Sequence, residues 1–195
     1  IPMAVVLLGY SASFSEELQE DIPLRLELFG FSGKTTLLAK IAAQFFVLTT
    51  GLSIYTIVGY AALDLQVPRV SSALCFIICM ILISVLFFAL AHGVSLIFKK
   101  FGPTYAILMS FYFGVMILCG MMGLKTEDLP VFFQKIAALL PMSYIGNDFI
   151  DFWQEGSYNF APLIQAYLFF GGVSGIILLL ALRREKRNQG SLKDF

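Results

Sequence analysis

Charged residues are scarce in this sequence. Only 13% of the 195 residues are Asp, Glu, Lys or Arg, whereas soluble globular chains carry roughly 25%. Hydrophobic residues make up 58%, and the mean hydropathy is +0.84. Such a chain has too few charges to cover a water-facing surface. The composition therefore excludes a soluble globular domain and predicts a polytopic membrane protein.

Residue types that build chemical sites are also scarce. The thirteen basic residues equal the thirteen acidic ones, so no net charge indicates a nucleic-acid partner. The single histidine and the three cysteines form no close cluster, which excludes a zinc signature and a disulfide framework. We therefore expect no cofactor and no metal in this chain.

Long apolar runs are what the sequence does contain. The run 1–14 has neither an initiating Met nor a charged region before it, so we expect the end of a truncated span rather than a signal peptide. Four further runs exceed the roughly 20 residues that a spanning helix needs. The predicted fold is an all-α polytopic bundle of transmembrane helices. The expected complete spans are 37–63, 70–98, 103–124 and 160–182.

The basic residues predict how the chain crosses the membrane. If 15–36 is a cytoplasmic loop, four crossings return the tail 183–195 to the cytoplasm. Of the thirteen Lys and Arg residues, only Arg69, Lys125 and Lys135 then lie outside. This distribution obeys the positive-inside rule, and the inverted topology violates it.

The segment 125–159, expected on the outer face, has the pattern of two short helices. Asp128 is placed to cap the first, with Pro130 in its first turn, and Pro141 separates the two. Each piece is too short to cross a membrane. We expect an interfacial or re-entrant cap, and an ordinary structured loop is the alternative.

The expected cytoplasmic loop contains an apolar stretch, IPLRLELF, at 22–29. Its alternation of apolar and charged residues also fits a strand. Pro23 near the start, Gly30 just past the end and the Leu, Arg and Glu residues between them favour a short helix.

This short helix is expected to have two apolar sides. At about 100° per residue, Ile22, Leu26 and Phe29 share one side, while Leu24, Leu28 and Phe31 lie opposite. A helix of this kind suits a position between the membrane bundle and a groove on another protein. A membrane-surface helix without a partner is the alternative. The predicted docking residues are Ile22, Pro23, Leu24, Arg25, Leu26, Glu27, Leu28, Phe29 and Gly30.

The expected spans contain almost no ionisable side chains. Lys40 and His92 are the exceptions. Both lie near a cytoplasmic end, where their side chains can reach the surface, and we interpret His92 as a packing residue rather than a ligand. An ion-coupled carrier and an intramembrane enzyme are therefore disfavoured. The stretch GFSGKTT at 30–36 is not a phosphate loop, because Leu28 stands where the GxxxxGK[ST] pattern needs its first Gly. Any driving energy must come from another subunit.

Two local patterns indicate a family. The first is an acidic stretch followed by Arg25, a turn at Gly30, and Ala39 with Lys40 at the start of an apolar helix. The second is Leu129 and Pro130, followed by Pro141, Met142, Ser143 and Tyr144, and then Asp148. In these patterns and in its layout the chain resembles the permease subunits of type-2 ATP-binding-cassette exporters.

The resemblance implies a structure and partners. Permeases of this kind have six spans, of which this chain supplies the last part of the second onward. Two permease copies or homologues form a dimer in membrane lipid, and a cytoplasmic ATPase that binds ATP and Mg docks on the short helix. The expected location is the bacterial cytoplasmic membrane. The family's outer segment corresponds to the predicted cap, with Pro130, Pro141, Tyr144 and Asp148.

The expected function is export of a hydrophobic or amphipathic substrate, such as a drug, an antimicrobial peptide or a lipid-linked molecule, by a subunit without a catalytic site. A non-transporting membrane assembly or immunity protein that binds partners is the alternative. We place the substrate path at Met109, Tyr112, Phe113 and Met116, because flexible Met beside aromatic rings can repack around varied apolar cargo. Lipid contact explains the same composition.

A pair of glycines predicts where helices pack closely. Gly171 and Gly175 are four residues apart in the last expected span, a spacing that lets helix backbones approach one another in a bilayer. We expect this pair to serve packing within the chain rather than dimerisation.

Overall fold

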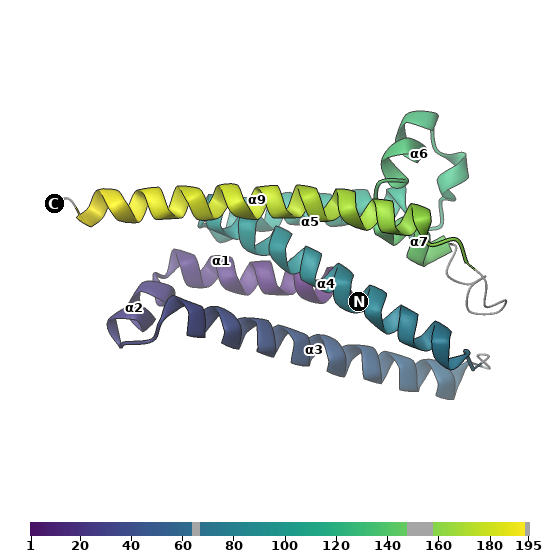
Figure 1. Cartoon of the computed structure of the whole chain (residues 1–195), viewed down its shortest axis with the longest axis horizontal. Helices are drawn as coiled ribbons and strands as arrows, with labels where there is room; N and C mark the ends of the chain where they lie inside the picture. Colours follow the sequence, from purple (N-terminus) through teal and green to yellow (C-terminus); the bar gives the residue numbers. More distant parts are fainter. Residues whose placement is uncertain (64–66, 148–157, 194–195) are drawn as a thin grey trace.

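The computed structural model describes residues 1–63, 67–147 and 158–193, and the regular secondary structure of these segments is helical throughout. The predicted all-α fold is confirmed. In chain order (Figure 1), the elements are the π-helix η1 (Met3–Tyr10), α1 (Ser11–Gln19), α2 (Ile22–Leu28), α3 (Gly33–Ala62), α4 (Val70–Phe98), α5 (Phe101–Leu118), the 3-10 helix η2 (Thr126–Asp128), α6 (Val131–Ala137), α7 (Pro141–Asn147) and α9 (Ala161–Lys193).

Four helices in the described segments are long and apolar enough to cross a membrane. They are Gly33–Ala62, Val70–Phe98, Phe101–Leu118 and Ala161–Arg187. Each overlaps one of the four expected spans. The chain is a multi-pass membrane protein, as its composition predicts.

Two helix ends differ from the apolar runs that predicted them. The first run was expected to stop at Phe14, but the helix continues through α1 to Gln19, so the connection to α2 is only Glu20 and Asp21. The last run was expected to stop at Leu182, but α9 continues to Lys193. Hydropathy marks where a helix leaves the membrane, and a helix can continue beyond that point.

The span expected at 103–124 is too long, because α5 ends at Leu118. Gly120 adopts φ +74°, and the amide of Met121 donates to the carbonyl of Met116 at 2.9 Å. This is a Schellman ending, in which a glycine in the left-handed region terminates a helix. The apolar run passes through the glycine without a change in hydropathy, which is why hydropathy missed it.

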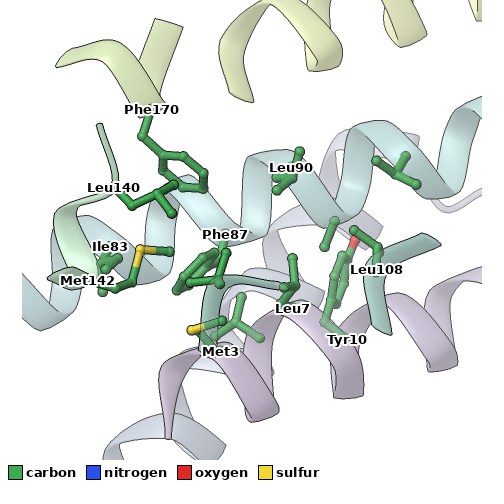
Figure 2. Close-up of a cluster of buried hydrophobic side chains, with 14 of the residues drawn as sticks. Met3, Leu7, Tyr10, Ile83, Phe87, Leu90, Leu108, Leu140, Met142 and Phe170 are labelled. Atoms are coloured by element: carbon green, nitrogen blue, oxygen red, sulfur yellow. The ribbon is translucent and has the colours of Figure 1, made fainter. Parts of the chain in front are cut away.

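Helix α4 lies at the centre of the bundle and packs against η1, α1, α5 and α9. Phe87 of α4 is fully buried and meets Phe170 of α9 edge-on, with 5.7 Å between ring centroids. Figure 2 shows side chains from η1, such as Leu7, on the other side of the same helix. The core therefore joins segments that are far apart in the sequence.

Helix α3 lies at the edge of the bundle, and Leu48 is its one buried residue. The Gln44 side chain attaches it to η1, since Nε2 donates to the Val5 carbonyl at 2.8 Å. A polar side chain in an apolar bundle needs such a partner. The remaining apolar surface of α3 suits contact with lipid.

The loops divide between the two ends of the bundle. Figure 1 shows α2 and the C-terminal end of α9 at one end, and α6 and α7 at the other. This arrangement matches the relative sides that the topology predicts. That the α2 end faces the cytoplasm stays a prediction.

Candidate functional site

Helix α2 lies where the sequence predicts a docking helix. Asp21, just before it, adopts φ +55°, and Pro23 lies in its first turn. Gly30, just after it, adopts φ +90°, and the amide of Phe31 donates to the Leu26 carbonyl at 3.0 Å. Gly30 therefore ends the helix as predicted, again through a Schellman motif. Sharp turns on both sides make α2 a separate short element.

The apolar side chains of α2 and the turn after it lie in two environments. Ile22 and Leu26 are half-buried. Phe29 was expected on their side, but it is 81% exposed, because the helix ends at Leu28 and the chain turns away at Gly30. We define the docking face by the four exposed apolar side chains of this region, Leu24, Leu28, Phe29 and Phe31.

The GFSGKTT stretch forms a helix end and a helix start. Ser32 is the N-cap of α3, and its Oγ accepts a hydrogen bond from the Thr35 amide at 3.2 Å. Lys34 lies in the first turn of α3 and is exposed. The geometry agrees with the prediction of a cap rather than a phosphate loop.

A groove of about 500 Å³ separates α2 from the ends of α3, α4 and α9. Apolar side chains such as Leu18, Leu96 and Leu182 form part of its lining. Charged side chains line it as well, and two of them, Lys99 and Glu185, form an ion pair at 3.6 Å. The groove thus leaves open space between the docking helix and the bundle.

Lys40 and His92, the two ionisable residues singled out in the expected spans, both line this groove. His92 is buried, and its Nδ1 is 2.7 Å from the Tyr10 hydroxyl oxygen. His92 is thus a satisfied packing residue, as we interpreted it. Lys40 was expected to reach the surface, but it forms an ion pair with Glu17 of α1. In the described segments, no three or more His, Cys, Asp and Glu residues are placed to hold a metal ion.

The four predicted path residues of α5 lie in different environments. Tyr112 and Met116 line a cavity of about 210 Å³, which η1, α4 and α7 also border. Met109 is half-buried, whereas Phe113 is 42% exposed. The structure therefore brings two of the four residues together and separates Phe113 from them.

Methionine is the most frequent residue type in the lining of this cavity. Five of the seven in the chain line it, together with aromatic and aliphatic side chains. They come from η1, from α4 and α5, from the turn after α5, and from α7, so no single stretch of sequence shows the cluster. The five residues are Met3, Met80, Met116, Met121 and Met142.

The predicted cap consists of two short helices, α6 and α7, which meet at Pro141 as expected. Asp128 does not cap α6; it ends η2, and Pro130 occupies the N-cap position because the backbone is extended at Leu129. The Tyr144 hydroxyl donates to the Ala138 carbonyl at 2.9 Å and ties α7 to the end of α6. The predicted cap residue Asp148 lies outside the described residues.

A family model places this architecture among known proteins. The model of the ABC-2 type transporter matches residues 3–151, which run from η1 through α7. The chain belongs to the ABC-2 type transporter family. Neither the curated proteins nor the solved structures contained a match to this ABC-2 transporter chain.

Family membership establishes the general role of the chain. It is the membrane domain of an ABC-2 transporter, a permease subunit of an ABC transporter. ABC-2 permeases in general work with an ABC ATPase. The fold and the family thus agree with the resemblance noted in the sequence.

Sequence reasoning missed α1 as part of the ABC-2 permease bundle. Tyr10, Phe14 and Leu18 recur every four residues, which is the spacing of one helix face. That spacing could have extended the first helix beyond residue 14. The acidic residues after Phe14 masked it, because they lower the hydropathy of the segment.

Proposed function

We propose that this chain is the permease subunit of an ATP-driven exporter that moves a hydrophobic or amphipathic substrate outward. A drug, an antimicrobial peptide and a lipid-linked molecule all fit this class. The docking face of α2 carries the proposal. Exposed apolar side chains on an extramembrane turn are typical of a protein interface, and Leu28 and Phe29 are each 81% exposed.

The partner at the docking face is a separate cytoplasmic ABC ATPase, which binds ATP and Mg and hydrolyses ATP. A second permease copy or a homologue completes the membrane part in the bacterial cytoplasmic membrane. The C-terminus then lies in the cytoplasm beside α2. Most of the Lys and Arg residues lie at the end of the bundle that carries α2 and the C-terminal tail, which supports that orientation.

The methionine-lined cavity supports the proposed substrate class. Thioether side chains are flexible and polarisable, so a cavity built from them can adapt to apolar molecules of different shape. Tyr112 and Met116 from the predicted path border it. Phe113, which is exposed, is better placed to contact lipid or the second permease.

Replacement of Leu24 and Leu28 by Asp tests the proposal. We expect affinity for the partner ATPase to fall on the order of 100-fold, because charges then replace apolar side chains in the interface. The measurements are co-purification with the ATPase and ATP hydrolysis in lipid vesicles, with and without candidate substrates.

A matched control is the same change at the other end of the bundle. Val131 and Phe132 of α6 are exposed apolar residues as well, and their replacement by Asp should leave ATPase binding intact. Wild-type transport by the Leu24→Asp, Leu28→Asp protein would contradict the assignment. A wild-type protein that binds no ATPase would favour a non-transporting membrane protein.

A further inference from the structure

Five side chains join three segments of the bundle next to the groove behind α2. They come from the continuous helix formed by η1 and α1, from α3 and from α4. We call them the junction cluster: Tyr10, Phe14, Glu17, Lys40 and His92.

Each residue of the junction cluster contacts at least one other member, so the contacts form an unbroken chain. The ring of Phe14 stacks on His92 with 4.6 Å between centroids and 12° between planes. Lys40 Nζ lies over the same Phe14 ring, 4.5 Å from its centroid, and pairs with Glu17. Together with the hydrogen bond between Tyr10 and His92, these contacts connect α4 to α1 and α1 to α3.

The hydrogen bond between Tyr10 and His92 is buried, so its loss would be costly. Tyr10 is 5% exposed and His92 is 8% exposed. A buried hydrogen bond adds only modestly to stability, whereas a buried polar group left without its partner costs its full desolvation penalty. Loss of the pair leaves two polar groups without partners. A displacement of one of these helices relative to the other therefore breaks this contact and carries a free-energy cost.

Helix α2 is joined by short connections to the two helices that carry most of the junction cluster. Glu20 and Asp21 connect it to α1, and only residues 29–32 separate it from α3. The groove of about 500 Å³ is lined on one side by Leu24 and Glu27 of α2, and on the other by Phe14, Lys40 and His92. A displaced α2 thus has room to move, and the cluster borders that room.

We propose that the junction cluster transmits a displacement of α2 to α4, and so to the helices packed around α4. Tyr10, Glu17, Lys40 and His92 are then positioning residues for transport, acting through the helices that they join. The Phe14 ring connects the two polar pairs, because it contacts His92 of one pair and Lys40 of the other. The inference rests on the proposed function, because it takes the partner ATPase as the source of the displacement.

The first test is Tyr10→Phe, which removes one hydroxyl and keeps the ring. Spin labels at Leu74→Cys on α4 and Phe132→Cys on α6, in a cysteine-free full-length protein with its ATPase, report the distance between these helices with and without ATP and vanadate. We expect the nucleotide-shifted population to fall about fivefold, at unchanged ATPase affinity. Tyr55→Phe, at an exposed position on α3, is the matched control.

The second test exchanges the charges of the ion pair. Lys40→Glu and Glu17→Lys singly should lower the shifted population, and the double exchange should restore most of it, because attraction across the pair returns. Lys34→Glu changes the same charge at an exposed site on α3 and should have no effect. If the double exchange restores the shifted population, the single variants lost it through the ion pair and not through misfolding.

The outcomes distinguish this inference from the proposed function. A wild-type protein that binds no ATPase overturns both. A wild-type protein that binds the ATPase but shows no nucleotide-dependent shift overturns the inference alone. Wild-type shifts in Tyr10→Phe and in both single charge variants also overturn it.

Discussion

Individual glycines decide how closely the helices of this permease approach one another. The spacing of Gly171 and Gly175 predicted a close approach at that pair. A Cβ at Gly171 would make an ordinary contact of 3.5 Å with the Leu86 side chain, and one at Gly175 would meet no atom of the described residues within 4 Å. The close approach is at Gly93 of α4, where a Cβ would lie 3.1 Å from the backbone N and Cα of Leu178.

Replacement of Gly93 by Val should therefore destabilise the bundle. The backbone of α9 must move to admit the side chain, and overpacking of this kind costs about 1–3 kcal/mol. Thermal unfolding in detergent measures the effect as a lower melting temperature. Gly175→Val places the same side chain in open space on α9 and should change the melting temperature much less. Equal losses in the two variants would show that α4 and α9 are not in tight contact at Gly93.

At the scale of elements, glycine in the left-handed region sets where helices end. Gly30 ends α2 and Gly120 ends α5 through the same pattern of amide hydrogen bonds. The first ending was predicted because Gly30 follows a short amphipathic pattern in a polar loop. The second was missed because Gly120 lies inside an apolar run.

The ending of α5 yields a stability prediction. Alanine at Gly120 or at Gly123 should cost roughly 1–2 kcal/mol of unfolding free energy, because both positions have positive φ. Gly120→Ala should cost more, since its Cβ would lie 3.2 Å from the Leu124 carbonyl oxygen, whereas a Cβ at Gly123 meets no described atom within 4 Å. Denaturant unfolding of the two variants measures the difference. A larger loss for Gly123→Ala would contradict the observed turn.

The two ends of the bundle carry different short helices. Helix α2, with the docking face, and the C-terminal end of α9 lie at one end of the bundle, and the short helices α6 and α7 lie at the other (Figure 1). Three spans, α3, α4 and α5, lie between α2 and α6, and an odd number of crossings places these two ends on opposite sides of a membrane. The distribution of basic residues predicts that the α2 end faces the cytoplasm.

Labelling of single cysteines tests this orientation. Phe29 and Val131 are both exposed and lie at opposite ends. In a background without Cys75, Cys79 and Cys119, a membrane-impermeant maleimide should label Val131→Cys in intact cells, and Phe29→Cys only after permeabilisation. The reverse pattern would invert the topology and remove the docking face from the cytoplasm.

The sequence predicted the elements of the candidate site better than their contacts. Composition and run length were enough for the helical class and for the presence of four spans, but not for the ends of α5 and α9, because hydropathy is a property of each segment alone. The position of α2 followed from Pro23 and Gly30, whose backbone preferences are local. The environment of Phe29 did not follow, because it depends on how the chain turns after the helix.

Composition, run length and local backbone preferences are thus sufficient to predict the helical class, the spans, the short helices and the family pattern that they form. They do not predict which helix faces meet, because that depends on the packing of the whole bundle. This packing placed Tyr10 against His92 and Lys40 against Glu17, and it gathered methionines from separate segments around one cavity. Contacts between distant segments depend on the rotation and crossing of whole helices, and no local run of residues specifies these.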